Sequence, residues 1–149
     1  MSRAWFFDQF PDFDHDPQGR VSEEFKRLAA HGKWKPQGKT WKRQWNLCVG
    51  DNWDHLIGHR SNYLETWQAM CYKLELSGDF SSITKCRKAL SRVYVNIVDV
   101  IECWVTNETP RKFHNSHKLM EYSKREEKIV NRNIAKQDRV LRVLLKKLF

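Results

Sequence analysis

The stretch SITKCRKALSRVYVNIVDVIECWV, residues 82–105, carries the strongest helical pattern in the chain. Apolar side chains recur in it at steps of three and four residues, which is the spacing of one buried face of an α-helix. The residues on that face are Ile83, Cys86, Leu90, Val93, Ile97, Val100, Ile101 and Trp104. The stretch therefore predicts one long central helix, although the β-branched residues of YVNIV favour a strand locally.

Helical patterns also lie on both sides of this central stretch. Apolar steps of three and four predict helices over residues 40–56 and 63–74, and a short helix is expected over residues 114–123. Ser22 is a suitable N-cap for a helix over residues 23–31, because its hydroxyl can accept a hydrogen bond from a backbone N–H of the first turn. We therefore predict an all-α fold, a single compact domain of about five helices.

The N-terminal segment differs in composition from these helices. Residues 6–17 alternate aromatic and acidic side chains, and Pro11 and Pro17 disfavour helix at the residues that precede them. We therefore expect residues 1–20 to form an extended aromatic and acidic arm that packs on a helical domain of residues 21–149.

Length and composition limit the chain to one domain with a substantial core. Its 149 residues are too few for two full domains, and its seven Trp and eight Phe supply apolar area that folding buries. No apolar run approaches the roughly 20 residues of a membrane span, and no signal-peptide pattern is present. We therefore expect an intracellular protein of the nucleus or cytoplasm, with its four cysteines reduced.

The net charge of +9 is unevenly distributed along the chain. Residues 1–24 carry two basic and six acidic residues, and residues 25–60 carry eight and two. Residues 61–108 carry five and six, and residues 109–149 carry twelve and four. The positive charge thus lies in two blocks on either side of a nearly neutral middle, which we expect to form the core.

The first basic block interleaves cations with aromatic side chains. This combination holds nucleic acid, because cations neutralise phosphates and aromatic rings stack on bases. The candidate nucleic-acid-binding residues of the block are Lys33, Trp34, Lys35, Lys39, Lys42 and Arg43. Trp41 and Trp45 fall instead on an apolar stripe that continues to Cys48, so we expect them in the core.

The second basic block lies on a last predicted helix, over residues 126–148. At about 100° per residue, apolar residues such as Ile134 and Leu141 share one side of this helix. The candidate nucleic-acid-binding residues on the opposite side are Arg132, Lys136, Arg139, Lys146 and Lys147. We expect them to form a cationic ridge that contacts phosphates.

Two patterns in the sequence partly match known metal sites, and neither is expected to bind a metal. An EF-hand register places Asp12, Asp14, Asp16 and Glu23 at ligand positions. Pro17 stands where that loop needs a glycine, so calcium binding is not expected. A zinc site built from Cys103, His114 and His117 would need a distant fourth ligand, and solvated histidines are the simpler interpretation. We predict no metal and no cofactor.

Enzyme signatures are absent from the sequence, which has no nucleophile elbow, phosphate-binding loop or dinucleotide-binding motif. Asp99 and Glu102 are the best carboxylates for general acid–base catalysis, because they lie three positions apart in the most apolar stretch. A polar stripe paired with basic residues explains them better, so no catalytic residue is predicted.

Four segments occur together along the chain: FFDQFPDFDHDP (6–17), VSEEFKRLAAHGKW (21–34), ETWQAMCYKLEL (65–76) and CRKALSRVYVNIVDVIE (86–102). With them the chain resembles a family of fungal proteins of unknown function that carry an FFxxFPxFxxDP arm, a WQxxC segment and a CRxxxxxxxVNIVD segment. The resemblance implies a fungal, intracellular, mainly helical domain, and it transfers no catalytic residue to this chain.

The leading hypothesis is a non-enzymatic nucleic-acid-binding module that uses both basic surfaces, mainly through phosphate contacts. The alternative is a protein-interaction module whose basic surfaces meet an acidic partner protein. An enzyme that uses Asp99 and Glu102 is the third hypothesis. Convergence of the two basic surfaces on one groove would favour nucleic acid, whereas opposed surfaces would favour ordinary solvation.

Overall fold

The computed structural model of the chain describes residues 6–57, 63–135 and 138–145. These residues form seven α-helices, two short 3-10 helices and a two-stranded antiparallel sheet. In chain order the elements are η1 (Phe6–Gln9), α1 (Val21–His31), α2 (Lys39–Leu56), α3 (Leu64–Lys73), α4 (Ile83–Leu90), β1 (Tyr94–Val95), α5 (Ile97–Thr106), β2 (Lys112–Phe113), α6 (Ser116–Arg125), η2 (Arg132–Ala135) and α7 (Arg139–Leu145). The predicted all-α fold is confirmed, with more helices than expected.

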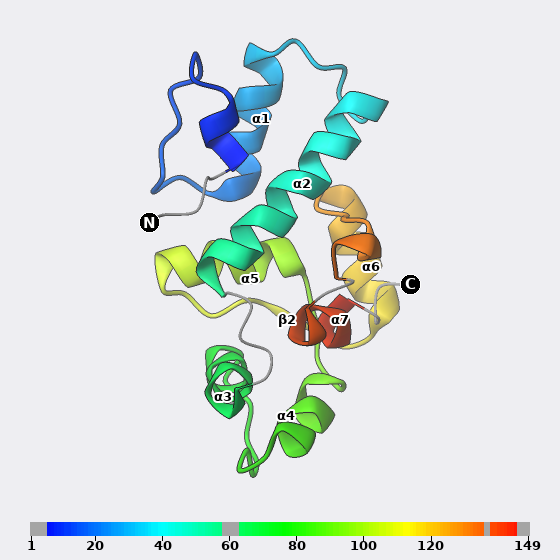
Figure 1. The fold of residues 1–149 in the computed structure, drawn as a ribbon. Helices are drawn as coiled ribbons and strands as arrows, with labels where there is room; N and C mark the ends of the chain where they lie inside the picture. The colour runs from blue at the N-terminus through cyan, green and yellow to red at the C-terminus, as the bar shows by residue number, and fades with distance from the viewer. Residues whose placement is uncertain (1–5, 58–62, 136–137, 146–149) are drawn as a thin grey trace.

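Helix α2 crosses the molecule obliquely (Figure 1). The elements η1, α1, α5 and η2 all pack against it. Its inward side chains, Trp41, Trp45, Cys48, Val49 and Trp53, are buried. Both the helix predicted over residues 40–56 and the core positions predicted for its tryptophans are therefore confirmed.

The described part of the arm, residues 6–20, is a 3-10 turn followed by further turns that lie beside α1 (Figure 1). Phe6 and Phe7 are buried, and the Phe6 ring lies 6.4 Å from the Phe25 ring of α1. The Phe6 N–H donates a hydrogen bond of 2.6 Å to the Asp51 carboxylate of α2. Since burying one Phe contributes about 1.5–3 kcal/mol, these aromatic anchors hold the arm on the helices.

The central helix predicted over residues 82–105 is wrong, because the structure divides this stretch into two helices. Helix α4 ends at Leu90, strand β1 follows and pairs with β2, and α5 begins after Asn96. The Asn96 Oδ1 atom accepts hydrogen bonds from the backbone N–H groups of Val98 at 2.9 Å and Asp99 at 3.2 Å. An asparagine that caps in this way starts a new helix.

The last helix predicted over residues 126–148 is confirmed only over α7 and is wrong for the described residues before η2. After α6, Glu127 takes a positive φ of 57°, and the chain has no regular structure until η2. The Trp45 indole donates a 2.8 Å hydrogen bond to the Ile129 carbonyl. The chain therefore turns inward toward α2 in place of the first part of the predicted amphipathic helix.

Helices α3 and α4 pack against each other at the lower end of the molecule (Figure 1). The Gln68 amide of α3 donates a 2.8 Å hydrogen bond to the Phe80 carbonyl in the connection between them. Cys71 of α3 and Cys86 of α4 are buried, and all four cysteines are free thiols. The helix predicted over residues 63–74 is confirmed.

Candidate anion-binding surfaces and the buried ion network

The basic block, defined as residues 33–43, connects α1 to the first turns of α2. Its five cationic side chains are exposed, and none of them forms an ion pair within the described parts of the chain. They are Lys33, Lys35, Lys39, Lys42 and Arg43. No Asp or Glu occurs between Glu24 and Asp51, so the block has no local carboxylate to neutralise it.

Trp34 of this block is half-buried, and it packs on the aromatic side chains beneath it. Its ring lies 5.7 Å from the Phe10 ring of the arm and 6.0 Å from the Phe25 ring of α1. A Cβ atom at Gly32 would come within 2.9 Å of the Trp34 indole nitrogen, so the glycine leaves room for the indole. Trp34 therefore anchors the block to the domain, and only part of its ring is accessible for stacking on a nucleic-acid base.

Of the five residues predicted to form a cationic ridge on a last helix, the structure describes the side chain of Arg139 alone. Lys136, Lys146 and Lys147 lie outside the described residues, as does the side chain of Arg132. Arg139 is described and begins α7. Its guanidinium carbon lies 5.8 Å from the centre of the Trp67 ring, so Arg139 faces α3.

A second cationic site lies where α4 meets α7, and we call it the arginine hollow. It has a volume of about 320 Å³ and is lined by Arg87, Arg139, Arg142 and Val143. Sequence reasoning missed Arg87 and Arg142. The three-residue spacing of Arg139 and Arg142 was the available signal, whereas the approach of Arg87 depends on the packing of α4 against α7.

The basic block and the arginine hollow are far apart. The α1–α2 connection lies at the upper end of the molecule, whereas α4 and α7 lie in its lower half (Figure 1). The two cationic sites therefore do not converge on one groove.

Asp99 and Glu102, the carboxylates considered for catalysis, belong to a buried ion network. The Lys128 ammonium lies 2.7 Å from Asp99 Oδ1 and 3.2 Å from Glu102 Oε1. Burial lowers the pKa of Lys128, but the hydrogen bond to Asp99 and the charge of Glu102 outweigh it and raise that pKa well above its usual value. The two carboxylates thus have a permanently charged partner.

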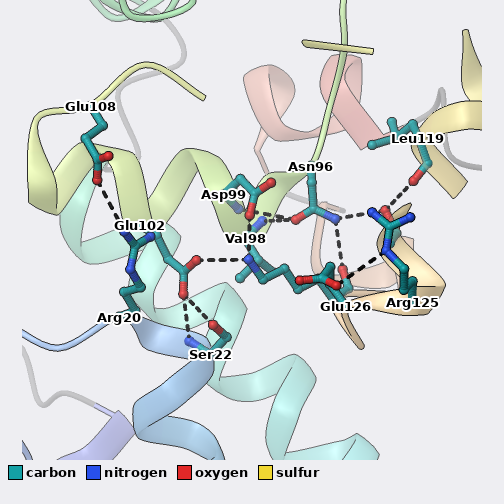
Figure 2. A network of polar contacts seen from close by, with 12 residues as sticks. Arg20, Ser22, Asn96, Val98, Asp99, Glu102, Glu108, Leu119, Arg125 and Glu126 are labelled. Atoms are coloured by element: carbon teal, nitrogen blue, oxygen red, sulfur yellow. Dashed lines mark hydrogen bonds and ion pairs between the residues drawn. The ribbon is translucent and has the colours of Figure 1, made fainter. Parts of the chain in front are cut away.

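Glu102 also joins α5 to the start of α1 (Figure 2). The backbone N–H of Ser22 donates to Glu102 Oε2 at 3.0 Å, and the Ser22 hydroxyl donates to the same oxygen at 2.5 Å. Ser22 therefore does not cap its helix as predicted, and Arg20 occupies the N-cap position without a side-chain bond. These contacts give Glu102 a structural role.

A cleft of about 1020 Å³ lies between the arm, α2 and α5. Phe7, Phe10 and Phe13 line it together with His15 and Glu102. His15 stacks on Phe7 with ring centres 3.8 Å apart, and its Nδ1 atom lies 3.0 Å from Glu24 Oε1. No lysine or arginine lines the cleft, so its lining lacks the positive charge of the two cationic sites.

Neither metal pattern forms a cluster within the part of the chain that the structure describes, where no three His, Cys, Asp or Glu side chains lie close enough to hold an ion. Asp16 Oδ1 instead accepts a 2.9 Å hydrogen bond from the backbone N–H of Gln18 and closes a turn of the arm. The described helices include none that is long and apolar enough to cross a membrane.

Comparisons with known protein families, curated proteins and solved structures found no match. The resemblance to a fungal family therefore stays a prediction.

Proposed function

We propose that the protein is a nucleic-acid-binding module that holds the phosphate backbone with the basic block. The observation that carries this proposal is the set of five exposed cations on eleven consecutive residues, none of which is paired with an acid in the described structure. Unpaired cations remain available to replace the counterions of a nucleic acid, and the release of those counterions drives binding.

The way in which the basic block is attached to the core supports the same proposal. Trp41 and Trp45 hold α2 on the core, whereas Lys42 and Arg43 on the same helix are exposed to solvent. Trp34 fixes the preceding loop on Phe10 and Phe25. Cations on a rigid support contact phosphates with a small entropic cost. The block has no evident base-reading side chains, so the contacts are to phosphates and are largely independent of base sequence.

The test is a salt series with fluorescently labelled single-stranded and double-stranded oligonucleotides, measured by anisotropy from about 50 mM salt upward. The variant Lys42→Gln/Arg43→Gln is expected to bind more weakly and to reduce the slope of log affinity against log salt by about 1 for each lost contact. The matched control is Lys88→Gln/Arg92→Gln, which removes the same two types of exposed cation near the other end of the molecule.

Absence of binding at low salt, or an equal loss in both double variants, would overturn the proposal. An acidic partner protein remains the alternative, because unpaired cations also bind carboxylates. Polyglutamate serves as the probe for it. If polyglutamate displaces the oligonucleotide at an equal concentration of charge, the block recognises anionic charge in general and the nucleic-acid assignment fails.

A further inference from the structure

The arginine hollow brings together three guanidinium groups from two helices that are distant in the sequence. Arg87 comes from α4, and Arg139 and Arg142 come from the first turn of α7, with Val143 beside them. Their convergence depends on the packing of α4 against α7. It is therefore a product of the tertiary fold, unlike the run of cations in the basic block.

Two of these arginines are held in place by one buried ring. The guanidinium carbons of Arg87 and Arg139 lie 5.7 Å and 5.8 Å from the centre of the Trp67 ring, which is fully buried in the core. Such cation–π contacts attract both guanidinium groups to the ring. They keep two of the three arginines of the hollow near one buried side chain.

Helix α7 is itself fixed by Asp138, the residue that precedes Arg139. One Asp138 oxygen accepts a 2.9 Å hydrogen bond from the Leu141 N–H, and the other accepts a 3.0 Å bond from the Trp53 indole of α2. Asp138 is buried and does not line the hollow. The oxygens of Asp138 are thus bound within the core.

No carboxylate lines the hollow among the described residues, and none of the three arginines has an ion pair there. Three like charges at one site repel one another, so an anion of more than one charge would stabilise the arrangement. Guanidinium groups bind phosphate oxygens through pairs of parallel N–H donors.

We propose that the arginine hollow binds a phosphate dianion, as found in inorganic phosphate, pyrophosphate or a terminal phosphomonoester. A volume of about 320 Å³ is at the lower end of the range of ligand sites, so it suits one or two phosphoryl groups rather than a whole nucleotide. The hollow is separate from the basic block. Its ligand can therefore bind whether or not the block binds nucleic acid.

The experiment titrates the full chain with inorganic phosphate and with pyrophosphate, measured by calorimetry at constant ionic strength. Arg142→Gln is the main variant, because Arg142 is exposed and makes no ring contact in the described structure, so its loss leaves the core intact. It is expected to weaken pyrophosphate binding by about tenfold or more, the effect of losing a charge-assisted hydrogen-bonding group. Arg87→Gln is expected to act in the same direction.

Lys88→Gln is the matched control, because Lys88 is exposed, follows Arg87 on α4 and does not line the hollow. It removes the same charge and is expected to change the affinity by less than about twofold. An equal loss in Lys88→Gln and Arg142→Gln, or no detectable binding of either probe to the wild type, would overturn the proposal.

A second arm identifies the source of the phosphate. Oligonucleotides with and without a 5′-phosphate are compared on the wild type and on Arg142→Gln. If the 5′-phosphate adds affinity that Arg142→Gln removes, the hollow holds the end of a nucleic acid. If pyrophosphate binds and the 5′-phosphate adds nothing, the ligand is a small phosphate compound. Loss of oligonucleotide binding in the basic-block variant with intact pyrophosphate binding separates this inference from the proposed function.

Discussion

Replacing Lys128 with methionine tests whether the buried ion network stabilises the fold. Methionine keeps an apolar stem of similar length but removes the ammonium group that lies 2.7 Å from Asp99 and 3.2 Å from Glu102. The side chain of Glu102 is 1% exposed and that of Asp99 is 10% exposed, so water has little access to the carboxylates that remain. We therefore expect Lys128→Met to fold but to lose stability.

The magnitude follows from two independent estimates. Removing one partner of a buried ion pair costs about 3–5 kcal/mol. Two charge-assisted hydrogen bonds at about 1.5–3 kcal/mol each give a similar range. Glu102 keeps both donors from Ser22, so we expect the lower part of the range, about 3–4 kcal/mol. For a chain of this size, that loss lowers the thermal midpoint by about 10 °C.

The assay is urea unfolding at neutral pH, followed by tryptophan fluorescence and by circular dichroism. The control is Lys124→Met, because Lys124 is an exposed lysine nearby on α6, and it is expected to change the free energy of unfolding by less than about 0.5 kcal/mol. The triple variant Lys128→Met/Asp99→Asn/Glu102→Gln should recover much of the loss, since no unpaired charge is left buried. A loss below about 1 kcal/mol in Lys128→Met would refute the reasoning.

Two further predictions concern acid stability and the start of α5. Burial raises the pKa of Glu24, but hydrogen bonds from Asp16, Arg27 and His15 outweigh it and leave that pKa below its unfolded value of 4.5. The stability that Glu24 contributes is therefore present above about pH 4.5 and is lost as the pH falls through the lowered value. The urea midpoint should fall more steeply between about pH 5 and 3 for the wild type than for Glu24→Gln. Parallel curves for the two proteins would contradict this prediction. Asn96→Ala should lower the free energy of unfolding by about 2–4 kcal/mol, measured by thermal unfolding, because it removes the cap of α5 and leaves buried groups without their donor. A loss below about 1 kcal/mol would show that water replaces the side chain.

The sequence predicted helices where a periodic apolar pattern coincided with a local boundary signal. Residues 40–56 and 63–74 are examples, since glycine or polar residues lie just outside each pattern. The stretch of residues 82–105 was misread because its apolar spacing continues through Asn96. Asn96 caps the second helix and does not lie inside one long helix, and sequence spacing does not distinguish these two roles.

The candidate sites were less predictable, because they depend on which segments meet. Lys128 was not singled out from the sequence, yet the structure buries it against two carboxylates that lie more than twenty residues earlier in the chain. Arg87 lies on α4 and meets Arg139 only through helix packing. The local spacing of apolar residues gives no information about such long-range contacts. The basic block was visible in the sequence because all of its residues are consecutive.

The order of Ser22, Glu102 and Lys128 along the chain bears on how the protein is synthesised. The ribosome makes Ser22 early, Glu102 much later and Lys128 after most of the chain. Until Lys128 emerges, a nascent chain would have to bury two carboxylates without their cation. The helices before α6 also lack their contacts with η2 and α7 until those elements have been synthesised, so the native core is completed late in translation. A fragment that stops before Lys128 is therefore expected to be less stable than the full chain.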